Sequence, residues 1–101
     1  MKILITGANG MLAKSVRKRL ANGNELVCTD VNELDITNEE AVNALVATIE
    51  KEVGVIDILV NNAGIIKRIP MCDMTAAEFR QVIDVDLNAP FIVSKAVIPS
   101  M

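Results

Sequence analysis

A short glycine-rich segment near the N-terminus is the part of the sequence best suited to bind a ligand. Residues 6–13 read TGANGMLA, and they lie between the apolar run Ile3–Ile5 and an amphipathic stretch. Glycines let the backbone approach a ligand closely, and the N–H groups and dipole at a helix start favour an anion. A strand, a glycine-rich turn and a helix in this order therefore predict a cradle for a phosphate group.

A carboxylate follows at a spacing that suits a second part of the same ligand. Asp30 stands twenty residues after Gly10, just past the apolar run Leu26–Cys28. There it is placed to accept hydrogen bonds from a ribose diol, and a phosphate cradle with a ribose acceptor points to a dinucleotide. The alternative is that Asp30 only caps a turn.

Other chemistry finds little support in the residue types. The chain contains no tyrosine and no histidine, which removes the usual proton donors, and its two cysteines are far apart in the sequence. A zinc site is not expected without histidine or a close cysteine pair. Asp84 and Asp86 diverge if they lie on a helix. We therefore expect no metal site and no catalytic residue.

Composition narrows the protein class. With 101 residues, 51% of them hydrophobic, the chain is expected to form one domain with an aliphatic core. A net charge of −3 argues against nucleic acid or an anionic membrane surface as a partner. Met1 leads straight into a strand pattern, and no apolar run is long enough to cross a bilayer. These features predict a cytoplasmic protein.

Strand and helix patterns alternate along the chain. Strands are predicted at residues 2–6, 25–29, 34–36 and 56–61. The first helix is predicted at residues 10–21, and the second from a cap at Thr37 to about residue 53. The third is predicted from a capping box of Thr75 and Glu78 to about residue 98. This alternation predicts an open, parallel α/β sheet of about four strands in the order 3-2-1-4, with three helices.

The predicted sheet and its last helix leave apolar surface uncovered. The helix at 75–98 is apolar on most of its sides, which a four-stranded sheet cannot cover. The strand at 56–61 would also be an unprotected edge of the sheet. We therefore expect a homodimer formed through this helix or through this strand edge.

Three motifs carry a family resemblance: TGANGMLA at 6–13, DILVNNAG at 57–64 and VDLNAPF at 85–91. Together they resemble the N-terminal half of the short-chain dehydrogenase/reductase family. Residues 1–52 resemble the extended branch of dTDP-4-dehydrorhamnose reductases, also through ELDIT at 33–37, and residues 55–101 resemble gluconate 5-dehydrogenases. Two branches in one chain suggest an engineered fusion with a junction near 51–54.

The resemblance implies a half-Rossmann NAD(P)-binding domain and assigns a role to each segment. It implies that Gly7 and Gly10 shape the pyrophosphate turn and that Asn9, Met11 and Leu12 wrap the pyrophosphate. Asp30 would hold the adenosine ribose and favour NAD over NADP, because a 2′-phosphate would meet a carboxylate. The remaining positions would border the adenine and the middle of the cofactor, and they are Asp35, Ile36, Asn62, Ala63 and Gly64.

The sequence also departs from the family. Ala13 replaces the third glycine of the turn, Asp86 replaces an active-site asparagine, and the family's serine and Tyr-x-x-x-Lys would lie beyond residue 101. We therefore expect a non-catalytic half-domain that binds NAD or its ADP-ribose part weakly. The alternatives are a scaffold without ligand binding and the N-terminal half of an oxidoreductase that needs its missing catalytic half.

Overall fold

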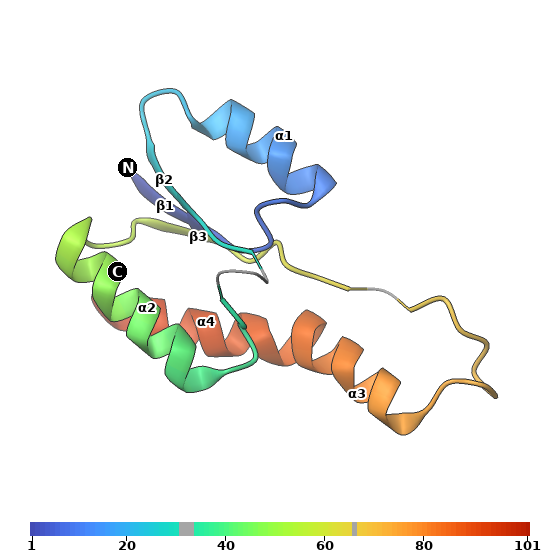
Figure 1. Cartoon of the computed structure of the whole chain (residues 1–101). Coiled ribbons are helices and arrows are strands. Elements are labelled where there is room, and N and C mark those ends of the chain that lie inside the picture. Colours follow the sequence, from blue (N-terminus) through green and yellow to red (C-terminus); the bar gives the residue numbers. More distant parts are fainter. Residues whose placement is uncertain (31–33, 66) are drawn as a thin grey trace.

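The computed structural model describes residues 1–30, 34–65 and 67–101, and its strands and helices alternate along the chain (Figure 1). The three strands are β1 (Lys2–Ile5), β2 (Glu25–Cys28) and β3 (Ile58–Val60). The helices are α1 (Met11–Leu20), α2 (Glu39–Glu52), α3 (Ala76–Ile83) and α4 (Ala89–Val97). A π-helical turn, Asp84–Asn88, joins α3 to α4, and a 3₁₀ turn, Ile98–Ser100, follows α4.

The sheet is parallel, and β1 is its central strand. The order is β2-β1-β3, with Ile3 opposite Leu26 on one side and opposite Ile58 on the other. All strands point the same way, so their carboxyl ends lie at one edge of the sheet. Ligands of open α/β sheets bind at that edge.

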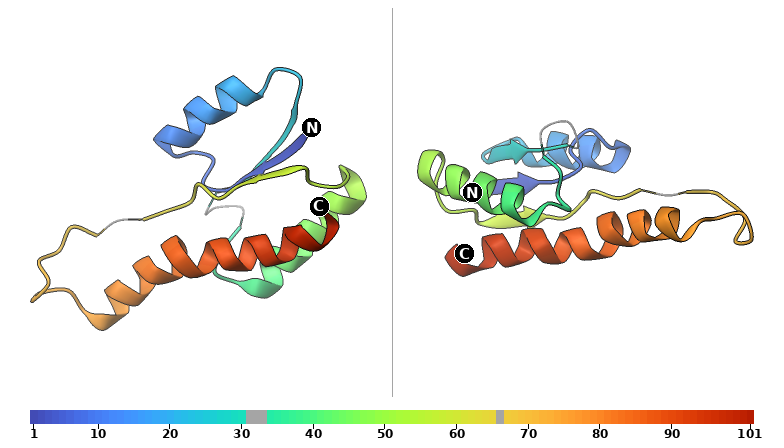
Figure 2. Two further views of the ribbon diagram at one scale, coloured as in Figure 1. Left: turned by 180° about the vertical axis from the view of Figure 1, so that it is seen from behind. Right: turned by 60° about the horizontal axis from the view of Figure 1, so that its bottom comes forward.

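Helices cover both faces of the sheet, giving three layers (Figures 1 and 2). Ile3 and Ile5 pack with Ala13 of α1 on one face. Leu4 points to the opposite face, where it packs with α2 and α4 through side chains such as Val46 and Val93. This alternation follows from the two-residue period of a strand. Among the residues that the structure describes, α1 is the helix that packs on the face of Ile3 and Ile5.

The brief strand predicted at 34–36 is wrong. Leu34 and Asp35 lie in no strand and Ile36 lies in a turn, so the described part of the chain has three strands in the order β2-β1-β3 and not four in the order 3-2-1-4. The Asp35 carboxylate accepts hydrogen bonds from the Thr37 backbone N–H at 3.0 Å and from its hydroxyl at 2.6 Å. Such short-range bonds favour a turn over a ladder.

The cap of α2 also differs from the prediction. Asn38, not Thr37, is the capping residue, and its side chain accepts a hydrogen bond from the Ala41 N–H at 3.0 Å. The Thr37 hydroxyl donates instead to the Asp35 carboxylate at 2.6 Å. The helix therefore begins one residue later than a cap at Thr37 would place it.

The last helix is interrupted, whereas the sequence predicted one helix over 75–98. The capping box of Thr75 and Glu78 at its start is confirmed. Further on, the Ala89 N–H donates to the Asp84 carbonyl, five residues earlier, and the turn becomes π-helical. Pro90 has no N–H and its ring disfavours a regular α-turn before it. An extra residue in the preceding turn accommodates the proline.

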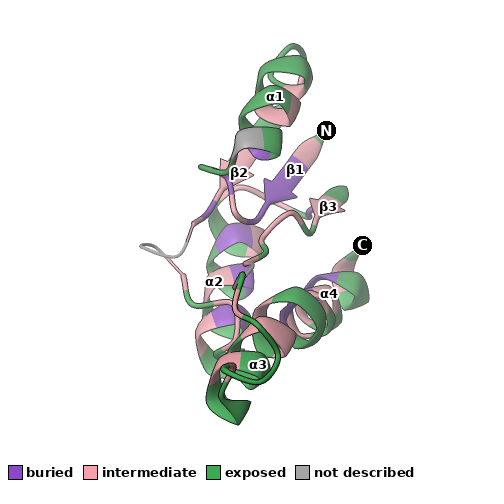
Figure 3. Cartoon of the chain, turned by 90° about the vertical axis from the view of Figure 1, so that its right-hand side faces the viewer, coloured by how far each residue is buried: buried purple, intermediate pink, exposed green. Residues whose placement is uncertain are grey.

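Burial differs sharply between the elements (Figure 3). Buried side chains are concentrated on β1 and on the inner faces of α2 and α4, whereas α3 has none. Large apolar side chains on the last helical segments stay exposed, among them Phe79, Leu87 and Phe91. Within the described residues, no helix is both long enough and apolar enough to cross a bilayer.

Candidate functional site

The glycine-rich turn connects β1 to α1 and lies against the turn after β3. Gly7 has a φ of +61°, which disfavours residues with a side chain. A Cβ at this position would lie only 2.6 Å from the Cα of Ala63. Gly7 is therefore required for the close approach of two backbone segments more than fifty residues apart.

A buried threonine fastens these two segments together. The Thr6 hydroxyl oxygen accepts hydrogen bonds from the N–H groups of Asn62 at 3.2 Å and Ala63 at 3.3 Å. In return, the Asn62 side-chain amide donates to the Gly7 carbonyl at 3.1 Å. The glycine-rich turn and the Asn62–Gly64 turn thus form one polar unit at the carboxyl edge of the sheet.

The start of α1 is arranged to favour an anion. Its capping residue is Gly10, which offers no side-chain cap, and its first turn contains no acidic residue. The Arg17 guanidinium donates to the Ala8 carbonyl at 3.0 Å, which holds the turn against the helix. Unpaired N–H groups at a helix start and the positive end of its dipole attract phosphate.

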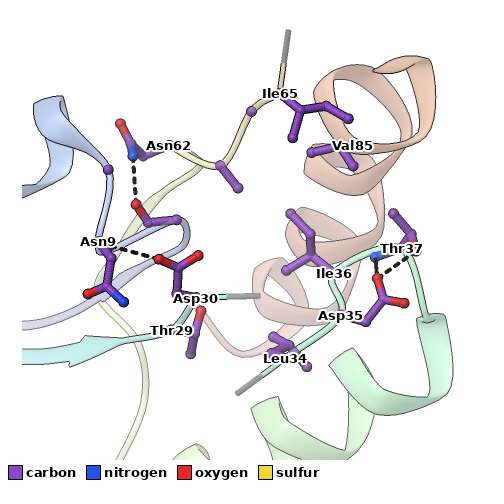
Figure 4. A pocket seen from close by; sticks show the side chains of 14 residues that line it. Asn9, Thr29, Asp30, Leu34, Asp35, Ile36, Thr37, Asn62, Ile65 and Val85 are labelled. Carbon is purple, nitrogen blue, oxygen red and sulfur yellow. Dashed lines mark hydrogen bonds between the residues drawn. The ribbon is translucent and has the colours of Figure 1, made fainter. Parts of the chain in front are cut away.

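Asp30 lies two residues after the end of β2 and faces the glycine-rich turn (Figure 4). Its Oδ2 accepts a hydrogen bond from the Asn9 N–H at 3.1 Å. This contact supports the reading of Asp30 as a residue that fixes a turn. A carboxylate has about four acceptor positions, so the bond to Asn9 leaves a role towards a ribose diol open.

These segments surround a cavity of about 410 Å³, the size of a small-molecule site (Figure 4). The predicted site residues in its lining are Gly7, Asn9, Gly10, Asp30, Asp35, Ile36, Asn62, Ala63 and Gly64. Leu12 is not among them, and its side chain is 69% exposed. The side chain of Met11 lies outside what the structure describes.

The cavity lining also contains residues that the sequence reasoning missed. They are Thr29, Leu34, Thr37, Ile65 and Val85. Four of these are direct neighbours in sequence of predicted site residues, so extending each motif by one position would have found them. Val85 is the first residue of the VDLNAPF motif and precedes Asp86, and it reaches the cavity through the packing of the π-helical turn.

The wall formed by Asp35 carries a persistent negative charge. The Thr37 hydroxyl and backbone N–H both donate to this carboxylate, and they lower the pKa of Asp35 below its usual value. Asp30 and Asp35 line the same cavity.

Asp86 and Asp84 have structural partners. Oδ1 of Asp86 accepts a hydrogen bond from the Ile65 N–H at 2.8 Å, which ties the segment after Gly64 to the π-helical turn. Oδ1 of Asp84 accepts from the Asn88 side-chain amide at 2.9 Å. In the described part of the chain, no three histidine, cysteine, aspartate or glutamate side chains are grouped to hold a metal ion.

Comparison with known proteins places this site in a family. A family model described as enoyl-(acyl carrier protein) reductase matches residues 1–101. It covers both sides of the junction predicted near 51–54, and the fusion itself stays a prediction. The chain is 55% identical over 67 residues to 2-dehydro-3-deoxy-D-gluconate 5-dehydrogenase of Formosa agariphila, covering 66% of this chain and 25% of that protein. It is 40% identical over 93 residues to 5-keto-D-gluconate 5-reductase of Escherichia coli K12, and this match covers 92% of this chain and 35% of that protein.

Solved structures agree with the sequence matches. The 2-keto-3-deoxy-D-gluconate dehydrogenase of Streptococcus agalactiae is similar with a TM-score of 0.77 and 44% identity, over 99% of this chain and 46% of that one. The aldohexose dehydrogenase of Thermoplasma acidophilum is similar with a TM-score of 0.91 and 31% identity, and the match covers 99% of this chain and 44% of that one. The chain thus spans less than half the length of these relatives. By family match, sequence identity and fold, it belongs to the short-chain dehydrogenase/reductase family.

Proposed function

We propose that the chain binds NAD, or the ADP-ribose part of NAD, weakly in the cavity at the carboxyl edge of the sheet. The observation that carries the proposal is the meeting of three segments around one cavity: the start of α1, Asp30 after β2, and the Asn62–Gly64 turn after β3. A helix start suits the pyrophosphate and the carboxylate suits the adenosine ribose. Membership in a family of dehydrogenases supports NAD(P) as the ligand class.

The proposal assigns these 101 residues to binding and not to catalysis. The sequence contains no tyrosine and no histidine, so two common proton donors are absent from it. Its cavity would hold the adenosine side of the cofactor, whereas contacts to the other half of NAD would be few. Loss of those contacts weakens affinity by about tenfold for each 1.4 kcal/mol. A cytoplasmic location belongs to the same proposal.

Titration with NAD tests this proposal, with NADP and ADP-ribose as comparators and NMR chemical shifts as the readout. We expect saturable binding of NAD and ADP-ribose in the millimolar range, weaker binding of NADP, and loss of binding in Asp30→Ala. The matched control is Asp73→Ala, which removes an exposed carboxylate outside the cavity. If the wild-type chain shows no shifts at the highest NAD concentration, the proposal is wrong and the chain acts as a scaffold.

A second candidate function rests on the names of the relatives. Two of them are a 2-dehydro-3-deoxy-D-gluconate 5-dehydrogenase and a 5-keto-D-gluconate 5-reductase, and each is much longer than this chain. On this reading, the chain supplies the NAD-binding part of an oxidoreductase that acts on a sugar acid. Co-expression with a C-terminal half carrying the family's serine and Tyr-x-x-x-Lys should then restore NAD reduction, measured as absorbance at 340 nm (the absorbance of NADH). An assembled complex without turnover would exclude it.

Self-association is part of the proposal. Phe79, Leu87 and Phe91 are 57%, 64% and 62% exposed on the helical segments after residue 75, and Ile58 on β3 is 38% exposed. Apolar patches of this kind on a small domain indicate an interface. We propose that two copies of the chain pair through this helical face or through the β3 edge.

A further inference from the structure

Thr29 is a buried polar residue at the floor of the candidate site. It follows β2, is only 6% exposed and lines the cavity. Its backbone groups are paired, since its N–H donates to the Ile5 carbonyl at 3.0 Å and its carbonyl accepts from the Ala8 N–H at 2.9 Å. Its hydroxyl oxygen, by contrast, has no hydrogen-bond partner in the part of the chain that the structure describes.

A buried hydroxyl without a partner is destabilising, because it has lost its bonds to water and gained none. A valine would have the same shape without this cost. Thr6, the other buried threonine, has its hydroxyl fully engaged with Val60, Asn62 and Ala63. The Thr29 hydroxyl is thus the exception, and its partner is to be sought among molecules that enter the cavity.

The position of Thr29 indicates which part of a ligand this partner is. Figure 4 shows Thr29 next to Asp30 and near Leu34, on the side of the cavity away from Asn62. Under the proposed function, on which this inference rests, that side receives the adenosine. A hydroxyl both donates and accepts, as a ribose hydroxyl does. Turning about χ1 towards a ligand would break no existing hydrogen bond of the side chain.

We infer that the Thr29 hydroxyl is a specificity-determining group that hydrogen-bonds the adenosine ribose of the bound nucleotide beside Asp30. Two neighbouring residues after one strand would then contact the same sugar, one through a carboxylate and one through a hydroxyl. The bond exists only when ligand is present, so it contributes to affinity and not to the stability of the free protein.

Two substitutions separate this role from a packing role. Thr29→Val keeps the shape and removes the hydroxyl, and Thr29→Ser keeps the hydroxyl and removes a methyl group. NMR titration with NAD, with AMP as a probe of the adenosine side and with nicotinamide mononucleotide as a probe without adenosine, measures affinity. We expect Thr29→Val to bind NAD and AMP about five- to tenfold more weakly, as for loss of one neutral hydrogen bond. Thr29→Ser should bind as the wild type does.

Thermal unfolding of the free proteins supplies the second readout. Thr29→Val should have a Tm equal to or a few degrees above that of the wild type, because it removes an unpaired polar group. Wild-type affinity in Thr29→Val would overturn the inference and leave the proposed function intact. Weaker binding together with a lower Tm would also overturn it, as a packing effect. A wild-type chain that binds no AMP and no NAD would overturn the proposed function, and this inference with it.

Discussion

At the scale of single residues, the candidate site is held together by contacts within the protein. Gly7 leaves room for Ala63, Thr6 holds the next turn, and Asp30 accepts the Asn9 N–H. When a glycine-rich turn and an acidic residue are found in a sequence, their role is usually taken to be ligand binding alone. Here the same atoms first fix the shape of the cavity, so their substitution should affect folding as well as binding.

Gly7→Ala tests the close approach of the two turns. The new Cβ would lie 2.6 Å from the Ala63 Cα at a φ of +61°, so both a backbone clash and conformational strain are expected. Gly23→Ala is the matched control, because Gly23 has a φ of +81° with nothing within 4 Å of its Cβ. We expect the control to lose about 1 kcal/mol of unfolding free energy and Gly7→Ala to lose about 2–4 kcal/mol. Urea denaturation measures both, and equal losses would contradict a clash.

The titration of Asp35 tests the turn that replaced the predicted strand. The Thr37 hydroxyl and N–H lower the pKa of Asp35, so its folded pKa lies below its unfolded pKa. The resulting stabilisation is fully present above the usual value of 3.8 and is lost as the pH falls through the lowered pKa. Thr37→Val should move the carbon-detected NMR titration of Asp35 back up towards 3.8. Thr48→Val, far from Asp35 on α2, should leave it unchanged.

At the scale of elements, the sequence predicted best where a signal is local and the chain is regular. The β1 strand, the start of α1 and the capping box of Thr75 and Glu78 all carry such signals, and all are present. The errors fall where short-range bonds or a proline compete with the pattern. Asp35 and Thr37 fold a predicted strand into a turn, and Pro90 turns the middle of a predicted helix into a π-helical turn.

For the candidate site too, local motifs could be predicted from the sequence, whereas contacts that depend on packing could not. The glycine-rich turn, Asp30 and the Asn62–Gly64 turn could be predicted because their motifs are contiguous in the sequence. Val85 belongs to a motif too, but its place in the cavity wall depends on how the helical segments pack on the sheet, which the motif does not give. The Leu12 side chain is exposed to solvent, and a role of Leu12 in wrapping the phosphates stays a prediction.

Thr75→Ala tests how α3 is held. This helix has no buried residue, so its capping box rather than core packing should stabilise it. Removing the threonine hydroxyl costs a helix about 1 kcal/mol. We expect faster amide exchange confined to α3, with an unchanged midpoint of global unfolding. Thr48→Ala, in the middle of α2, serves as the control, and its effect should not reach α3. An equal loss of protection in the core strands would show that α3 unfolds together with the rest of the chain.

At the scale of the whole molecule, the layers are unequally covered. In the described part of the chain, the face with Leu4 packs against two helices, whereas the face with Ile3 and Ile5 packs against α1 alone. Both β2 and β3 are edge strands of the described sheet. Relatives of more than twice this length share the fold over nearly all of the chain. A sheet of this kind, with two open edges and an exposed apolar helix face, is expected to acquire a partner.

Leu87→Glu tests whether a second copy is that partner. Leu87 is 64% exposed in the π-helical turn, and Leu12 is 69% exposed on α1, so Leu12→Glu introduces the same charge at a similarly exposed position on another helix. Burying a carboxylate in an apolar interface costs several kcal/mol, enough to weaken a dimer by about 100-fold or more. Analytical ultracentrifugation should show the wild type and Leu12→Glu as dimers and Leu87→Glu as a monomer. A Leu87→Glu protein that stays dimeric would move the interface to the β3 edge, where Ile58→Lys is the next substitution. A wild type that is monomeric at every concentration tested would exclude the dimer, and the exposed helix face would then be expected to bind a different partner.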